Sequence, residues 1–235
     1  MPRGRERTLL GVSRAAYKDL CIDAVDAARV GEFWSVALGL DLHRDDSGDA
    51  YLTGPTPQHT VWINTVPEPK SVKHRMHLDV QVPSPAALAT AGATVVDATS
   101  FEWTAMLDPE GGEFCAFRGD ADPGQRLLSI VLDCDDPAPI AMWWAETLGA
   151  LVVHDERGFS SVVGIDDSPF RGLDFVPVPE AKTTKNRLHI DVTTADVDAL
   201  VRTGARVLRA EDDEIRWHVL ADPDGNEFCA FVRPG

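Results

Sequence analysis

Residues 179–192 read PEAKTTKNRLHIDV, and this stretch decides the fold because residues 67–80 read PEPKSVKHRMHLDV. The two stretches agree at eight of their 14 positions. A second pair follows in the same order: residues 108–117 read DPEGGEFCAF and residues 222–231 read DPDGNEFCAF, agreeing at eight of ten. Two long matches at a nearly constant interval indicate an internal repeat. The chain therefore contains two copies of one domain.

The boundary between the copies falls in residues 119–125, GDADPGQ, which are turn formers without an apolar period. We expect an N-terminal arm over residues 1–16, a first domain over 17–119, a linker over 120–125 and a second domain over 126–235. The arm carries several arginines around an apolar run too short for a secretory segment or a membrane span. It is interpreted as a flexible or edge-pairing tail.

Charge and cysteine content exclude several classes of protein. The chain of 235 residues has a formal charge of −16, which repels phosphate backbones and anionic lipid surfaces. We therefore expect neither nucleic acid nor a membrane as a partner. The four cysteines form no CxxC pair, which argues against a disulfide framework or a zinc ribbon and favours a reducing, cytoplasmic location.

Each copy reads as two consecutive βαβββ units. In the first unit, a half-buried strand over residues 20–24 precedes a helix that Asp26 caps and Gly39 ends. Strands follow near residues 50–52 and 60–63. In the second unit, an alternating strand over 76–82 precedes a helix that starts at Ser84-Pro85, and strands follow near 101–107 and 113–117. The apolar face of the first helix is formed by Val30, Phe33, Trp34, Ala37 and Leu38.

The second copy repeats this plan, with Asp136-Pro137 starting one helix and Asp196 capping the next. Mixed strands with helices confined to one face make an α+β fold. The other, concave face of the sheet is then free to hold a ligand.

These landmarks resemble the glyoxalase/bleomycin-resistance family of the vicinal oxygen chelate superfamily, and within it the glyoxalase-like subgroup common in actinobacteria. The resemblance rests on the capping Asp, the helix with an aromatic pair and Leu-Gly, the Arg-x-His-x-Asp strand and the Asp-Pro-x-Gly-x-Glu-Phe-Cys hairpin, and covers both copies. It implies tandem glyoxalase-like domains whose βαβββ modules form curled sheets around a small-molecule cavity. In metal-dependent members a divalent ion lies on the concave face.

The family's metal-ligand positions map poorly onto this chain. Carried over copy by copy, they give two sets, Asp19/His77/Cys115 and Ser129/His189/Cys229. A thiol replaces the glutamate that a hard, octahedral ion requires, and a serine is a weak ligand. We therefore expect no metal cofactor. If a divalent metal is bound, the predicted ligands are Asp19, His77 and Glu113.

Two His-x-Asp pairs, His77 with Asp79 and His189 with Asp191, are the candidate catalytic groups. Alternation along a strand turns both members of each pair to the concave face. An imidazole steered by a carboxylate can act as a general base. The alternative is a buried pair that holds the sheet together or that anchors Arg75 and Arg187 on the neighbouring loop. His218 adds a third candidate to the second pair, forming the residue set of a two-histidine, one-carboxylate iron site.

Further candidates for ligand binding lie on the same expected face. Asp23 and Asp133 are either proton-transfer acids or carboxylates bonded to backbone amides or to the nearby arginine. Cys115 and Cys229 are either thiol nucleophiles or small buried hydrophobes. The strand tryptophans present flat rings to a ligand or pack in the sheet, whereas the helical ones belong to the core. The three strand tryptophans are Trp62, Trp103 and Trp217.

Two functions remain open at this point. The first is a metal-independent protein that binds and sequesters a small molecule, of the bleomycin-resistance-like kind. The second is a lyase, isomerase or dioxygenase that uses a histidine with a metal or a carboxylate. We expect the two copies to pair as an intrachain pseudo-dimer, with a homodimer as a further alternative.

Overall fold

In a computed structural model, the structure describes residues 13–233 with the exception of residue 47. The predicted N-terminal arm therefore lies outside the described residues up to residue 12, and its last two residues already belong to the first strand. None of the helices in the described part of the chain is both long and apolar enough to cross a membrane.

Each copy consists of two βαβββ modules, as the sequence predicts. Module 1 comprises β1 (Ala15–Ala24), α1 (Ala27–Leu38), β2 (Asp41–Arg44), β3 (Ala50–Thr53), the short 3-10 helix η1 (Pro57–His59) and β4 (Val61–Thr65). Module 2 comprises β5 (Met76–Val82), α2 (Pro85–Thr90), β6 (Thr94–Asp97), β7 (Thr104–Leu107) and β8 (Glu113–Arg118).

The second copy supplies modules 3 and 4. Module 3 comprises β9 (Leu127–Cys134), α3 (Pro137–Leu148), β10 (Leu151–His154), β11 (Ser160–Val163) and β12 (Gly172–Pro177). Module 4 comprises β13 (Leu188–Thr194), α4 (Val197–Arg202), β14 (Arg206–Arg209), β15 (His218–Ala221) and β16 (Glu227–Val232). The described residues thus form an α+β fold.

The residues predicted to cap and to end the helices do so in the structure. The Asp26 carboxylate accepts a hydrogen bond from the backbone N–H of Arg29, and Asp136 accepts one from Ala138. Both helices end at a glycine in the left-handed region, Gly39 at φ 70° and Gly149 at φ 68°. Glycine is favoured there because it has no Cβ to clash with the backbone.

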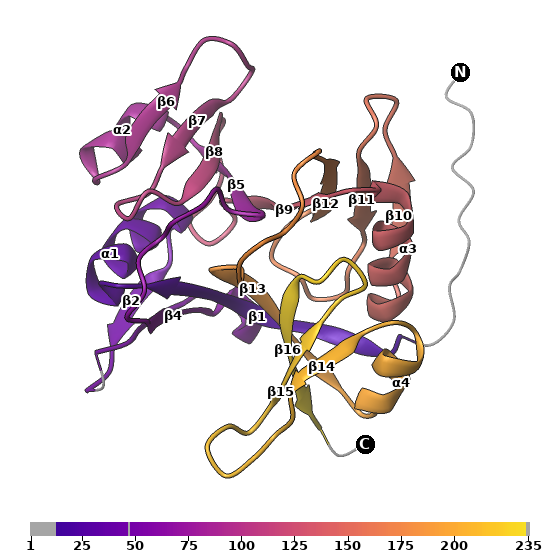
Figure 1. The fold of residues 1–235 in the computed structure, drawn as a ribbon. Coiled ribbons are helices and arrows are strands. Elements are labelled where there is room, and N and C mark those ends of the chain that lie inside the picture. The colour runs from indigo at the N-terminus through magenta and orange to yellow at the C-terminus, as the bar shows by residue number, and fades with distance from the viewer. Residues whose placement is uncertain (1–12, 47, 234–235) are drawn as a thin grey trace.

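The modules form two eight-stranded mixed sheets, and each sheet combines modules from both copies (Figure 1). Sheet A has the order β14-β15-β16-β13-β1-β4-β3-β2 and joins modules 1 and 4. Sheet B has the order β10-β11-β12-β9-β5-β8-β7-β6 and joins modules 2 and 3. The central pairs, β1 with β13 and β5 with β9, are antiparallel. The two copies therefore form an intrachain pseudo-dimer with exchanged modules.

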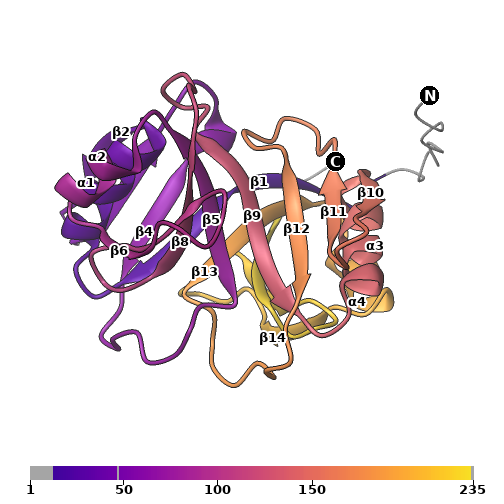
Figure 2. The same ribbon diagram turned by 90° about the horizontal axis from the view of Figure 1, so that it is seen from above.

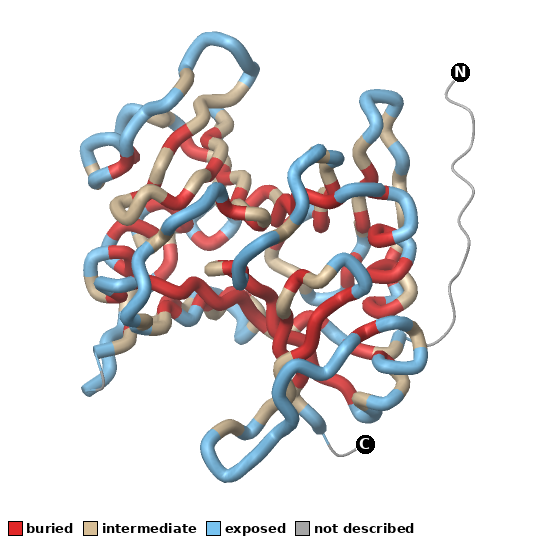
Figure 3. Tube along the Cα trace, viewed as in Figure 1, coloured by how far each residue is buried: buried red, intermediate tan, exposed pale blue. Residues whose placement is uncertain are grey.

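The helices and apolar faces of the sheets make one continuous core between the sheets. Phe33 and Trp34 of α1 meet Phe114 of β8 at ring-centroid distances of 5.5 and 5.4 Å, so module 1 packs on module 2 within the copy. Trp144 of α3 packs on Phe228 in the equivalent place at 5.2 Å. Figure 2 shows the central strands β1, β13, β5 and β9 from above, and Figure 3 shows that the middle of the molecule is largely buried whereas the connecting loops are largely exposed. The predicted core role of the helical tryptophans is confirmed, since Trp34, Trp143 and Trp144 are buried.

Candidate functional site

A cavity of about 430 Å³ lies on the concave face of sheet A, and we call it hollow A. Strands β1, β4, β13, β15 and β16 supply its walls, together with Lys185 from the loop before β13. Its apolar part is formed by Trp62, Trp217, Val219 and Phe231. Its polar part is formed by Lys18, Cys21, Asp23, Asn64, Lys185, His189, Asp191, Glu227 and Cys229. Aromatic walls with a few convergent polar groups are typical of a small-molecule site.

The predicted pair His189 and Asp191 lies at the polar end of hollow A, as alternation along β13 requires. His189 Nε2 lies 3.5 Å from Asp191 Oδ1 and 3.4 Å from Cys229 Sγ. The Cys21 thiol lies 3.6 Å from Asp191 Oδ2. Three strands, β1, β13 and β16, therefore bring an imidazole, a carboxyl group and two thiols into contact.

Asp19 joins this cluster through a local irregularity of β1. The register between β1 and β13 shifts between Tyr17 and Asp19. A bulge of this kind changes the face of the sheet toward which side chains point. As a result, Lys18 also lines hollow A. Lys18 Nζ lies 2.5 Å from Asp19 Oδ2, 3.9 Å from Asp191 Oδ2 and 4.2 Å from the centroid of the Phe231 ring. Trp62 Nε1 donates to Asp19 Oδ2 at 3.1 Å.

Several buried polar atoms around hollow A have no hydrogen-bond partner among the described residues. They are Asp19 Oδ1, Asp191 Oδ1 and His189 Nδ1. A buried polar atom without a partner costs about 1–3 kcal/mol, so such atoms are usually satisfied by a ligand or an ordered water. All three atoms are almost inaccessible, so they mark the buried polar base of hollow A.

Burial sets the protonation of this cluster. It lowers the pKa of His189 to about 4, so the imidazole is neutral at pH 7. Burial, and then the nearby charge of Asp19, raise the pKa of Asp191 well above its usual value. Burial also raises the pKa of the Cys21 and Cys229 thiols. Hollow A thus holds a neutral imidazole, a carboxyl group whose raised pKa favours its protonated form, and thiols whose raised pKa disfavours the thiolate that a nucleophile requires.

Sheet B carries the equivalent groups at a place we call site B. His77 Nε2 lies 3.6 Å from Asp79 Oδ1, and Asp79 pairs across the ladder with Cys115. Burial lowers the pKa of His77 to about 4, while burial and the charge of Asp174 raise the pKa of Asp79 to about 7. Burial raises the pKa of Cys115. Both predicted His-x-Asp pairs are therefore assembled, one in each sheet.

Asp23 and Asp133 have lysine partners rather than the predicted arginine or amide partners. Lys185 Nζ lies 2.5 Å from Asp23 Oδ2, and Lys73 Nζ lies 2.5 Å from Asp133 Oδ2. Each pair joins a loop of one copy to a strand of the other.

The ligand sets carried over within each copy are wrong, because the modules are exchanged. Asp19 lies in sheet A opposite Asp191, whereas His77 lies in sheet B opposite Val131, on the strand that carries Ser129. The substitute ligand Glu113 is also unsuited, since its carboxylate accepts from Lys70 Nζ at 2.8 Å and from the backbone N–H of His74 at 3.0 Å.

Because each sheet combines modules from both copies, the residues at the family's metal-binding positions also come from both copies. Trp62 of β4 stands opposite Cys21, and Asp174 of β12 stands opposite Val131. Sheet A therefore offers Asp19, Trp62, His189 and Cys229; sheet B offers Ser129, Asp174, His77 and Cys115. An indole N–H cannot bind a metal ion, and a protonated thiol is a poor partner for a hard ion. The sheet A set therefore does not fit the octahedral ion of the family, and Cys115 is the poor donor of the sheet B set.

Three further predictions are corrected by the strand geometry. His218 pairs with Ala230, and its neighbour Val219 pairs with Cys229 and lines hollow A, so His218 faces away and does not complete an iron site. Trp103 and Trp217 lie just before β7 and β15 rather than within them. Trp217 still lines hollow A, and Trp103 stacks on Phe101 at 4.8 Å.

Sequence reasoning missed Lys18 and Asp174. Lys18 is turned into hollow A by the irregular register of β1, for which the sequence has no signal. Asp174 could have been found from the repeat. The interval of 112 residues that relates His77 to His189 also relates Trp62 to Asp174, so Asp174 occupies in the second copy the position that Trp62 occupies in the first.

The comparisons with known proteins agree with this architecture. The family model of the glyoxalase-like domain matches residues 19–117 and again residues 129–231, so the chain belongs to the glyoxalase-like domain family. This places it in the vicinal oxygen chelate superfamily.

Solved structures share the fold over nearly the whole chain. Glyoxalase I from Zea mays is 17% identical, with a TM-score of 0.68 over 93% of this chain and 92% of that chain. A putative dioxygenase from Bacillus subtilis is 14% identical, with a TM-score of 0.61 over 95% of this chain and 87% of that chain. Among proteins with curated descriptions, none matches the sequence. At these identities the likeness establishes the fold alone.

Proposed function

We propose that this protein binds a small molecule in hollow A without the octahedral metal ion of its superfamily. The observation that carries the proposal is a cavity of about 430 Å³ whose walls are aromatic and whose polar end has three buried atoms without a protein partner among the described residues. A bound molecule would place its flat apolar part against Trp62 and Trp217 and its polar group against His189 and Asp191. Within the superfamily, such a role corresponds to sequestering a compound rather than transforming it.

The electrostatics of hollow A support a ligand with both a donor and an acceptor. Neutral His189 can donate one hydrogen bond and accept another, and the raised pKa of Asp191 favours a protonated carboxyl group that can do the same. Lys18 balances Asp19 inside the cavity. The four cysteines are free thiols, consistent with the reducing cytoplasm in which we place this activity.

The alternative function is a metal-dependent enzyme, and one observation favours it. Cys21, His189 and Asp191 have ligand atoms within 4.8 Å of one another, as do His77, Asp79 and Cys115. These groups lie partly outside the family's metal positions and include thiols, which suit a soft, tetrahedral ion. This alternative requires the thiols to lose their protons despite burial.

A ligand screen with matched variants tests the proposal. Saturation-transfer NMR with a library of small planar heteroaromatic compounds should yield binders to the wild-type protein. Trp62→Ala and His189→Gln should weaken these binders about tenfold or more, because each removes a wall or a polar contact. His154→Gln, in the sheet B strand β10, is the matched control and should bind like wild type. Binders that are unaffected by both hollow A variants would contradict the proposal.

A further inference from the structure

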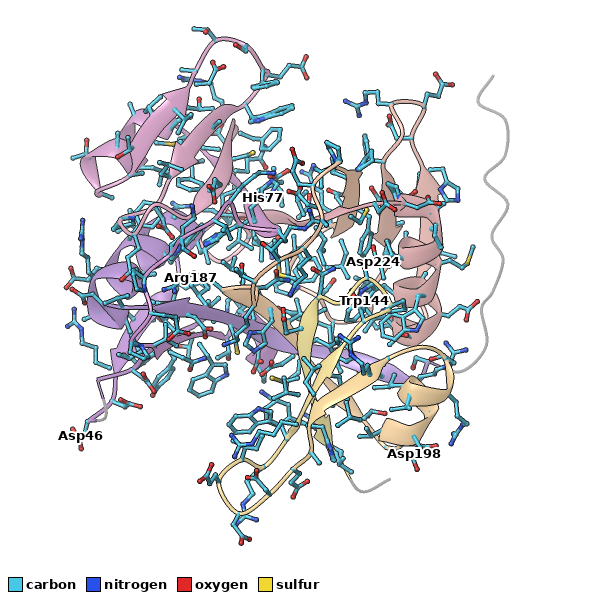
Figure 4. The ribbon with its side chains drawn as sticks, viewed as in Figure 1. Asp46, His77, Trp144, Arg187, Asp198 and Asp224 are labelled. Carbon is cyan, nitrogen blue, oxygen red and sulfur yellow. The ribbon has the colours of Figure 1, made fainter. Side chains whose placement is uncertain are left out.

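A second cavity, of about 230 Å³, lies between the two loops that join the modules within each copy. Residues 66–75 join β4 to β5, and residues 178–187 join β12 to β13. The loops meet near the middle of the molecule, where Figure 4 labels Arg187. We call this cavity the loop pocket; it is lined by residues 68–75, residues 184–187 and Asp23.

The loop pocket brings five cationic side chains together in an acidic protein. Five lysine and arginine residues line it, against two carboxylates, Asp23 and Glu68. The whole chain, by contrast, has a formal charge of −16. Four of the five cations have a carboxylate partner, and three of these partners, Glu113, Asp133 and Glu110, lie outside the lining of the pocket. Arg75 is the cation without an ion pair among the described residues, so the pocket is notable for its converging N–H donors rather than for a net charge. The five cations are Lys70, Lys73, Arg75, Lys185 and Arg187.

Two arginines at equivalent positions of the repeat converge on this pocket, and each is held by the loop of the other copy. Arg75 Nη1 donates to the carbonyl oxygen of Glu180 at 2.5 Å, and Arg187 Nη1 donates to that of Glu68 at 2.7 Å. A carbonyl oxygen fixes a guanidinium without neutralising it. Arg187 Nη2 also meets Glu110 at 3.3 Å, whereas Arg75 forms no ion pair within the described part of the chain. Arg75 therefore keeps its charge and unused donors.

Two lysines complete the set. Lys73 and Lys185 each have one carboxylate partner, Asp133 and Asp23, and their side chains remain 62% and 55% exposed. An ammonium group has three N–H donors, so one partner leaves donors for a ligand. Lys185 and Asp23 line hollow A as well as the loop pocket, so this ion pair lies between the two cavities.

We propose that the loop pocket is a binding site for a small dianion, either a phosphate monoester or a dicarboxylate. Two guanidinium groups that are positioned before binding, flanked by two ammonium groups, match the charge and the forked acceptor geometry of such anions. A volume of about 230 Å³ accommodates a molecule of this size. The site shares Lys185 and Asp23 with hollow A, but its two arginines lie outside hollow A, and it does not depend on that proposal.

Isothermal titration calorimetry with inorganic phosphate and with succinate, at ionic strength held constant with chloride, tests the site. We expect saturable binding of one equivalent of at least one of these probes to the wild-type protein. Phosphate alone would support a phosphate monoester, and succinate alone a dicarboxylate. Absence of saturable binding by both probes would overturn the proposal.

Variants locate the binding. The double variant Arg75→Gln/Arg187→Gln should weaken binding at least tenfold, and Arg75→Lys should weaken it less because the charge remains. Arg202→Gln, which removes an exposed arginine paired with Asp196, is the control and should leave the affinity unchanged. If the double variant does not fold, Lys73→Gln should still weaken binding about threefold or more. Unchanged affinity in a folded double variant, or in Lys73→Gln where the double variant does not fold, would refute the site.

Discussion

Replacing Asp79 by asparagine should stabilise the protein, and increasingly so as the pH rises. Burial, together with the charge of Asp174, raises the pKa of Asp79 to about 7 from the ordinary value of 3.8. The folded state therefore binds this proton more tightly than the unfolded state does. For a raised acid, stability is greatest below the unfolded pKa and falls as the pH rises towards the folded pKa.

The magnitude follows from the two pKa values, since one pKa unit corresponds to about 1.4 kcal/mol. Integrating the linkage relation gives a cost of about 2 kcal/mol at pH 5.5 and about 4 kcal/mol at pH 8.5 for keeping this carboxyl group in the folded protein. The Asp79 side chain is 15% exposed, so solvent screening reduces these figures little. Asparagine has nearly the same shape and does not ionise. The stability gained by Asp79→Asn should therefore increase by about 2 kcal/mol between these two pH values.

Urea unfolding followed by tryptophan fluorescence measures this gain at pH 5.5 and pH 8.5. Asp97→Asn is the control of opposite sign, because hydrogen bonds from Ser100 and Thr99 lower the pKa of Asp97 to about 2. It should destabilise the protein at both pH values. A gain for Asp79→Asn that is the same at both pH values, or a loss at pH 8.5, would refute the assignment of a buried, proton-retaining carboxyl group to site B.

Three further outcomes follow from the contacts. Lys185→Met should lower the free energy of unfolding by about 1–2 kcal/mol because it leaves the buried Asp23 carboxylate unpaired; urea titration checks this, and an effect no larger than that of Arg202→Met would contradict it. Gly225→Ala should lower the free energy of unfolding by about 1–2 kcal/mol. Gly225 has φ +85° and a Cβ added there would have no neighbour within 4 Å, so only backbone strain acts. An unchanged melting temperature would contradict this and show that the turn relaxes. Alkylation of the native protein by iodoacetamide at pH 8 should be much slower than alkylation in urea, since burial raises the pKa of all four thiols. A cysteine that reacts fast in the native protein would contradict this and indicate a thiolate nucleophile.

The sequence predicts the modules well and their assembly poorly. The repeat, the caps at Asp26 and Asp136 and the stops at Gly39 and Gly149 are local signals, and the structure bears them out. Alternation along β5 and β13 correctly turns His77, Asp79, His189 and Asp191 to the concave faces. These features depend only on neighbouring residues.

Which module pairs with which is a different kind of information. Because modules 2 and 4 are so similar, the pattern of β1 is compatible with either β5 or β13 as its partner. The structure pairs β1 with β13, and this choice moves Asp19 from His77 to His189. The orientation of the Lys18 side chain toward hollow A likewise depends on a register shift in β1, which no residue type in the sequence indicates. By contrast, the replacement of Trp62 by Asp174 in the second copy was readable from the repeat interval alone.

Metal analysis of protein purified without chelator, followed by titration with nickel and zinc, tests the central claim most directly. Hollow A lacks the donors for an octahedral ion, so we predict well under 0.1 equivalent of bound metal and a change in melting temperature of less than about 1 °C at equimolar ion. Stoichiometric metal, together with a clear rise in melting temperature that His189→Gln abolishes, would contradict a metal-independent binding site.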